Sequence, residues 1–119
     1  MANVNRFEDL IIWQESRFFV KLIYTSFDSQ KDYGFKDQIQ RASVSVMNNI
    51  AEGFERFSNK EFVQFLRIAK SSCAEVRSML YVAEDLNYIS QDEAKDLRAT
   101  SMKISGSIQN LIKKLQQRP

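Results

Sequence analysis

Apolar residues recur along this chain at steps of three and four residues, the spacing typical of amphipathic α-helices, in four separate segments. The most regular segment covers residues 59–87. Its apolar positions alternate strictly between steps of four and three, which predicts left-handed packing against neighbouring helices. These positions are Phe62, Leu66, Ala69, Cys73, Val76, Leu80 and Ala83.

The last segment, residues 91–117, repeats this spacing and predicts a further helix. Each of these two helices is preceded by a serine with a glutamate three residues later, Ser58 with Glu61 and Ser90 with Glu93. That pairing is a capping box, in which the serine side chain satisfies a free amide of the first helical turn. The expected inward positions are Ala94, Leu97, Ser101, Ile104, Ile108, Leu111 and Leu115.

The two N-terminal segments, residues 7–27 and 35–56, also predict helices. Between them, residues 28–34 are turn-like, and we expect Gly34 to supply a left-handed or hinge conformation. The first segment has an unusually wide apolar face made of two stripes, Leu10, Trp13, Val20, Tyr24 and Phe27 beside Phe7, Ile11, Phe18 and Leu22. The inward side of the second is Ile39, Ala42, Ser43, Val46, Ile50 and Phe54.

Together these segments predict an all-α fold, an antiparallel up-down four-helix bundle that forms one domain over residues 1–119. The short link at residues 88–89 makes the last two helices an antiparallel hairpin. The chain has only three glycines and one proline, which favours long uninterrupted helices. Cys73 is the single cysteine, and we expect a reduced thiol packed among apolar neighbours. With no signal-peptide pattern and no apolar run of about 18 residues, we expect a cytoplasmic protein without a membrane partner.

Most catalytic chemistry is excluded by composition. The chain has no histidine, no second cysteine to complete a zinc site, and only isolated glycines that cannot form a phosphate-binding loop. We therefore predict a protein that is not an enzyme and that needs no cofactor, metal or small-molecule substrate. Carboxylate-based catalysis stays an alternative, and it requires a deep pocket in which Glu52, Glu55 or Glu61 converge.

Basic residues on the segment 59–87 form a stripe on its outward side, beside the core positions, and no acid interrupts it before Glu84. One interpretation is a solvated face that keeps the bundle soluble, and the other is a strip that contacts phosphates without sequence preference. The formal net charge of +2 is too small to decide between them. Lys113, Lys114 and Arg118 form a second basic cluster, at a helix end where cations also favour the helix dipole. The strip consists of Lys60, Arg67, Lys70 and Arg77.

A polar stripe on the segment 35–56 has two interpretations as well. The stripe consists of Arg41, Ser45, Asn48 or Asn49, Glu52 and Arg56. It is either a solvated face or a buried network in which Glu52 accepts hydrogen bonds from Arg41 or from an asparagine such as Asn49. Gly53, in the same helix, costs about 1 kcal/mol relative to alanine. Close approach of another backbone would explain it, and so would fraying near the helix end.

Several large apolar residues exceed what one buried seam per helix needs. They are either scattered surface residues, which are normal, or a contiguous patch that marks a subunit interface. These residues are Trp13, Phe19, Phe57, Met79 and Tyr81.

Several short motifs, in this order and spacing, resemble one bacterial family over nearly the whole chain. It is the four-helix-bundle family first noticed as proteins encoded in intervening sequences of large-subunit (23S) ribosomal RNA genes. The motifs are Asp9-Leu10-x-x-Trp13, Tyr33-Gly34, QIQRASVS at 38–45, NIAEG at 49–53, EFxxFLxIA at 61–69 and Ser72-x-x-Glu75. The chain departs from the family pattern at Gln40, where members often have a second arginine, and at Met47, where they often have proline.

This family is similar to the accessory variability proteins of diversity-generating retroelements. Those proteins form ring- or barrel-like homopentamers with basic surfaces and act alongside a reverse transcriptase and nucleic acid. The resemblance therefore implies a homopentamer, with RNA or DNA and a reverse-transcriptase-type protein as further partners. The alternative function is a protein–protein scaffolding module without a nucleic-acid role.

Overall fold

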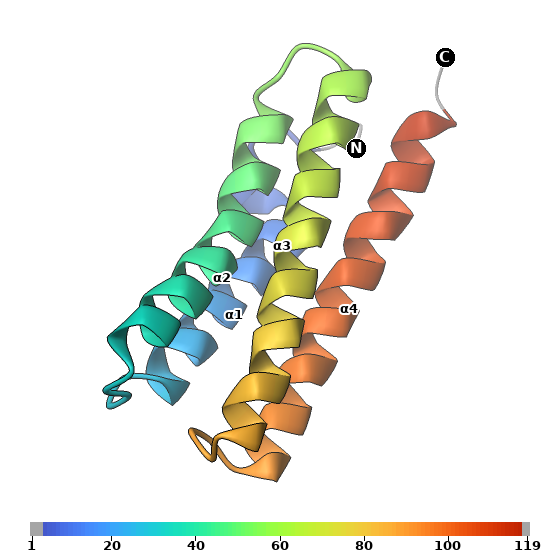
Figure 1. The fold of residues 1–119 in the computed structure, drawn as a ribbon. Helices are drawn as coiled ribbons and strands as arrows, with labels where there is room; N and C mark the ends of the chain where they lie inside the picture. The colour runs from blue at the N-terminus through green and yellow to red at the C-terminus, as the bar shows by residue number, and fades with distance from the viewer. Residues whose placement is uncertain (1–3, 118–119) are drawn as a thin grey trace.

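The computed structural model describes residues 4–117, which form four long α-helices after one short 3₁₀ turn and include no strand (Figure 1). The predicted all-α, up-down four-helix bundle is confirmed. The pairs in close contact are α1–α2, α2–α3, α3–α4 and α1–α4, so the α2–α3 seam lies opposite the α1–α4 seam. The elements are η1 (Phe7–Asp9), α1 (Ile11–Ser26), α2 (Tyr33–Phe54), α3 (Asn59–Asp85) and α4 (Gln91–Gln116).

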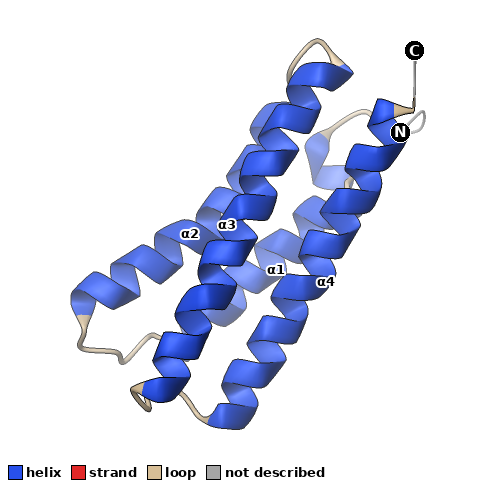
Figure 2. Ribbon diagram, turned by 45° about the vertical axis from the view of Figure 1, so that its right-hand side comes forward, coloured by secondary structure: helices blue, strands red, loops and turns tan. Residues whose placement is uncertain are grey.

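The helices run side by side in an elongated bundle of about 48 × 20 × 19 Å (Figure 2). The α2–α3 loop, η1 and the C-terminal end of α4 lie at one end of this bundle, and the α1–α2 and α3–α4 loops lie at the other (Figure 1). No helix within residues 4–117 combines the length and the apolar character needed to cross a bilayer.

Both predicted serine caps are present. The Ser58 hydroxyl accepts from the Glu61 amide at 3.2 Å, and the Ser90 hydroxyl accepts from the Glu93 amide at 3.1 Å. Asp32 caps α2 in the same way by accepting from the Phe35 amide. These side chains satisfy amides that have no partner within their own helix, so they fix where α2, α3 and α4 begin.

The expected role of Gly34 is wrong. Because Asp32 caps α2, the helix begins at Tyr33, and Gly34 lies inside its first turn. No glycine in the described part of the chain has a positive φ. The left-handed residue is instead Asn87, just after α3, with a φ of 58°, a conformation that asparagine tolerates better than most residues.

The segment 7–27 also differs from its prediction. It is not one helix, because Leu10 is extended between the 3₁₀ turn and α1. Since α1 is apolar around much of its circumference, the spacing alone does not determine which side faces the core. The structure turns Ile11 and Phe18 outward, 71% and 59% exposed, whereas Phe19 is fully buried. The buried residues of α1 are Ile12, Ser16, Phe19 and Ile23.

The inward positions predicted for the other three helices are confirmed, with two differences of degree. Phe54 in α2 is half-buried, and in α4 it is Ile112 that is fully buried while Leu111 is half-buried. The buried serines are hydrogen-bonded, as buried polar groups usually are, and three of them donate to backbone carbonyls. The Ser101 hydroxyl donates to the Cys73 carbonyl at 3.0 Å and so connects α4 to α3, and the Ser16 hydroxyl donates to the Ile12 carbonyl at 2.7 Å.

Candidate nucleic-acid interface

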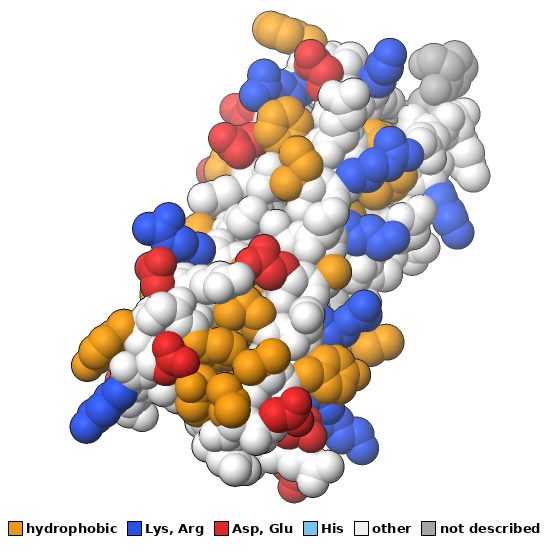
Figure 3. All heavy atoms as spheres, in the orientation of Figure 1, with side chains coloured by type: hydrophobic (Ala, Val, Ile, Leu, Met, Phe, Trp, Pro, Cys, Tyr) orange, Lys and Arg blue, Asp and Glu red, His pale blue; other side chains and the backbone are white. Residues whose placement is uncertain are grey.

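The basic strip lies on α3 where this helix meets α4. Lys60 and Arg67 are exposed, and Lys70 and Arg77 are half-buried. At a rise of about 1.5 Å per residue, Lys60 and Arg77 lie roughly 25 Å apart along α3. Figure 3 shows Lys and Arg side chains following this side of the bundle in a row.

Two adjoining surface hollows follow the strip along the α3–α4 seam, with volumes of about 660 and 440 Å³. Arg67 lines both, so the two hollows adjoin at this residue, and together we call them the basic groove. Among the described residues, no carboxylate lines it. The other lining residues are mostly hydroxyl and amide side chains, namely Ser58, Asn59, Gln64, Ser71, Ser105, Gln109 and Gln116, with Val63, Ala74 and Leu115. The basic groove therefore offers cations and neutral hydrogen-bond donors, the groups that contact phosphates.

One cation of the strip is held in place by α4. The Lys70 ammonium donates to the Gln109 side-chain carbonyl at 2.8 Å across the seam. A neutral amide leaves the charge of Lys70 uncompensated, so the ammonium is positioned without being neutralised.

The neighbouring cysteine is buried and free, as predicted. Burial raises the pKa of the Cys73 thiol from an ordinary value of 9.0 to about 12, and the charge of Arg77 opposes this shift only in part. A thiol with so high a pKa is almost never a thiolate near neutral pH, so Cys73 is a packing residue and not a nucleophile.

Cys73 should accordingly resist thiol reagents in the folded protein. At pH 8 the shift to about 12 leaves roughly 1000-fold less thiolate than in an unfolded chain, so reaction with Ellman's reagent should be at least 100-fold slower without denaturant than with it. The folded state also holds this proton more tightly, so its contribution to stability is present below pH 9 and is lost as the pH rises towards 12. Equal rates with and without denaturant would contradict this placement.

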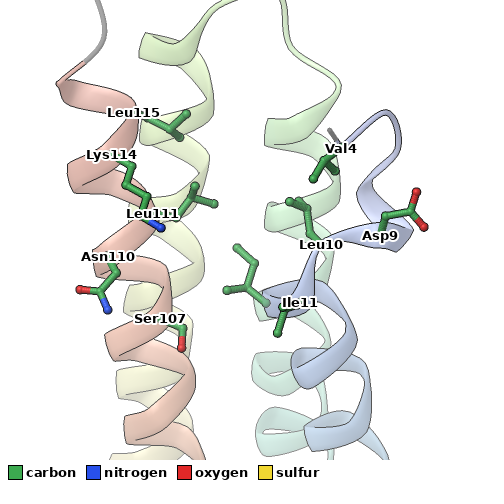
Figure 4. A pocket seen from close by; sticks show the side chains of 10 residues that line it. Val4, Asp9, Leu10, Ile11, Ser107, Asn110, Leu111, Lys114 and Leu115 are labelled. Atoms are coloured by element: carbon green, nitrogen blue, oxygen red, sulfur yellow. The ribbon is translucent and has the colours of Figure 1, made fainter. Parts of the chain in front are cut away.

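Arg118 of the second basic cluster lies outside the described residues. The two lysines of the cluster are divided between two surfaces, because adjacent residues on a helix point about 100° apart. Lys113 comes four residues after Gln109 and three before Gln116, so it shares their face and lies beside the basic groove. Lys114 lines a separate hollow between α1 and α4, opposite Leu10 and other apolar residues (Figure 4).

The polar network predicted from Arg41, Asn49 and Glu52 is wrong in two of its three members. Arg41 pairs with Asp37, four residues earlier on the same exposed face, at 2.9 Å. Glu52 is exposed and takes no part in the network. Asn49 alone is retained: its amide donates to the Ser45 carbonyl at 2.8 Å and to the Ser45 hydroxyl at 3.0 Å.

Ser45 belongs to the predicted polar stripe, but its partner Ser72 on α3 is a residue that we did not predict. The hydroxyls of Ser45 and Ser72 are hydrogen-bonded at 2.9 Å and join α2 to α3. Ser72 precedes the core position Cys73, and this adjacency is the signal that places it at a helix interface. The network is half-buried, so it orients the two helices and is no catalytic group.

The three glutamates considered for catalysis line one open surface hollow of about 610 Å³, beside Phe57 at the α2–α3 loop. All three are exposed, and the buried polar residues of the described chain are serines only. Within residues 4–117, no group of three acidic or cysteine side chains is placed to hold a metal ion. This glutamate hollow, formed by Glu52, Glu55 and Glu61 with Phe7, Ala51, Arg56 and Phe57, is therefore not the deep pocket that carboxylate catalysis requires.

The surplus apolar residues do not form one patch. Phe19 belongs to the core, and Trp13 packs edge-on against Phe7, with ring centroids 5.2 Å apart. Tyr81 is covered on one side by Arg98, whose guanidinium carbon lies 4.1 Å from the ring centroid. Phe57, at the other end of α3, is fully exposed.

Comparisons with known proteins agree with this architecture. A family model described as "23S rRNA-intervening sequence protein" matches residues 8–110. A solved structure from Bacteroides thetaiotaomicron, a protein of unknown function described as belonging to the S23 ribosomal protein family, has a TM-score of 0.81 and 24% sequence identity. The match covers 87% of this chain and 99% of that one, and it bears on the fold alone. The comparison with curated proteins found no match.

Proposed function

The chain belongs to the 23S rRNA-intervening sequence protein family, and from that premise we propose that it is a non-enzymatic, self-associating protein that binds nucleic acid through the basic groove. The observation that carries this proposal is the alignment of four cations along the two adjoining hollows of the basic groove, which no carboxylate lines among the described residues. Phosphates bound there would add affinity with each contact and without sequence preference.

The acids of the same stretch of α3 face other surfaces, which leaves the charge of the groove uncompensated. Glu75 accepts a hydrogen bond from Gln38 at 3.3 Å and so faces α2. Glu61 lines the glutamate hollow. The small net charge of +2 therefore results from segregated charges and does not argue against a local phosphate site.

Partial burial of two of its cations strengthens the attraction of the basic groove for phosphates. Lys70 and Arg77 are half-buried, and salt screens such charges less than it screens fully exposed ones. Self-association would repeat the groove on every copy and raise the avidity for a long nucleic acid. The family resemblance favours a homopentamer as that assembly.

The test replaces the strip by alanine, as K60A/R67A/K70A/R77A, and measures binding to duplex DNA and structured RNA by fluorescence anisotropy over a range of salt concentrations. Loss of four phosphate contacts should flatten the dependence of log K on log [salt] by about 3 to 4 for the duplex, since each contact contributes about 0.9. Binding should weaken by a similar factor for unrelated sequences.

A matched variant, R17A/K21A/R41A/K95A, removes the same charge from exposed positions outside the groove. It should keep most of the affinity. Binding that survives in the strip variant, or that both variants lose equally, would reject the basic groove as the nucleic-acid site.

A second candidate function is a protein–protein scaffold without a nucleic-acid role. It is favoured by Phe57, which is fully exposed at a loop tip, and by the open apolar hollow between α1 and α4. In the same titration, a scaffold would remain oligomeric and show no binding of either nucleic acid at physiological salt.

A further inference from the structure

Phe57 is the most exposed large apolar side chain in the described part of the chain. Its exposure is 105% of the reference value, at the tip of the loop between α2 and α3. One exposed apolar residue is ordinary on a protein surface. Phe57, however, lines the glutamate hollow with three acids, Glu52, Glu55 and Glu61, and one base, Arg56, so an aromatic side chain projects beside a surface with an excess of acids.

The matching concavity is the α1–α4 hollow, an open cleft of about 480 Å³ with largely apolar walls. In Figure 4, Leu111 and Leu115 of α4 lie across the gap from Leu10 and Val4. The α1–α4 pair is the most weakly packed of the four helix pairs, so its seam is open to solvent. Two charged residues line this hollow: Asp9, which pairs with Arg6 at 3.5 Å, and Lys114 of α4, the one cation among its described lining residues.

The positions of Phe57 and of the α1–α4 hollow indicate how one copy of the chain could contact the next. The α2–α3 loop lies at the same end of the bundle as η1 and the C-terminal end of α4, which together form the α1–α4 hollow (Figure 1). The two seams are on opposite sides of the bundle. Copies placed side by side in the same orientation therefore have Phe57 of one copy and the hollow of its neighbour at the same end of the assembly.

We propose that Phe57 of one copy inserts into the α1–α4 hollow of a second copy, with Glu55 of the first paired to Lys114 of the second. The proposal rests on the self-association in the proposed function and names the surfaces that carry it. The two surfaces differ, so the contact is head-to-tail, and repeating it builds a ring when the rotation between copies closes. The contact does not use Arg67, Lys70 or Arg77, so most of the basic groove stays open on each copy.

The first test is the assembly state by sedimentation velocity over a range of protein concentrations. Phe57→Ala should raise the dissociation constant about 30-fold or more, as expected for a central aromatic anchor. Tyr33→Ala is the matched control, because Tyr33 is 70% exposed at the opposite end of the bundle, and it should leave assembly unchanged. Circular dichroism confirms that each variant is folded.

A charge exchange tests the pairing itself. Glu55→Lys and Lys114→Glu should each weaken assembly at least about tenfold, and the double variant should recover most of the loss, because the pair is restored with opposite signs. Absence of recovery would overturn the Glu55–Lys114 pairing.

Disulfide crosslinking then distinguishes head-to-tail from symmetric contacts. Glu55→Cys and Asn110→Cys are made in separate copies, and buried Cys73 does not compete. A mixture should give crosslinked dimers that neither variant gives alone. Crosslinks of Glu55→Cys with itself would overturn the proposed geometry. If the wild-type chain assembles and Phe57→Ala assembles equally well, this interface alone is overturned. If the wild-type chain is a monomer, self-association is overturned as well. Nucleic-acid binding is decided by the separate experiment on the strip variant.

Discussion

Replacing Phe19 by alanine is expected to lower the free energy of unfolding by about 3–5 kcal/mol. Phe19 is fully buried on α1, within the core shared by the helices. Truncation removes a large apolar side chain from the interior and leaves a cavity that the surrounding helices fill only in part. Urea unfolding followed by far-UV circular dichroism measures the change.

The adjacent residue supplies the control. Phe18 is 59% exposed, and Phe18→Ala should change the free energy of unfolding by no more than about 0.5 kcal/mol. The two variants remove the same atoms one position apart, so their difference reports which face of α1 is inward. Equal losses, or a larger loss for Phe18→Ala, would show that α1 is rotated relative to the described structure.

Replacing Gly53 by alanine is expected to destabilise the protein by about 1–3 kcal/mol, although alanine favours a helix by about 1 kcal/mol. A Cβ at Gly53 would lie 2.6 Å from the Phe65 Cβ and 2.9 Å from the Phe62 Cδ1. The Phe65 Cβ is fixed to the α3 backbone and cannot move unless the helices separate. Of the two explanations for this glycine, close approach of a neighbouring helix is therefore the one that the structure supports.

Gly106 provides the opposite case in the same protein. It lies in α4. Apart from its chain neighbours and the nearby backbone of its own helix, no described atom lies within 4 Å of a Cβ placed there. Gly106→Ala should raise the free energy of unfolding by about 0.5–1 kcal/mol, because only helix propensity changes. Thermal and urea unfolding of both variants should shift in opposite directions, and a stabilising Gly53→Ala would contradict the close packing of α2 on α3.

The reliability of the sequence pattern depended on how narrow each apolar face is. In α3 the spacing leaves one possible inward stripe, and all seven predicted core positions are buried. In α1 apolar residues cover so much of the circumference that several stripes fit equally well. The pattern therefore places Phe19 among the apolar residues that exceed one buried seam per helix, although the structure buries it completely. Which of several apolar faces is inward is determined by the neighbouring helices, which a single segment does not specify.

In the candidate interface, too, one part could be predicted from the sequence and another part could not. The basic strip could be predicted because Lys70 and its partners keep a fixed offset from the core positions of α3. Its contact with Gln109 could not, because it depends on the rotation of α4 about its own axis. The polar network contains Ser72 in place of the predicted Arg41 and Glu52 for a similar reason. Asp37 on the same helix pairs with Arg41, and the position of α2 along α3 brings Ser45 to Ser72.

Lysine footprinting shows directly whether nucleic acid contacts the α3–α4 groove. The protein is acetylated briefly with and without a saturating duplex, and each lysine is quantified by mass spectrometry. We expect the duplex to protect Lys60, Lys70 and Lys113, whereas Lys21 and Lys95 should be equally reactive in both samples. Protection of Lys21 or Lys95 in place of the groove lysines, or no protection at saturation, would contradict this expectation.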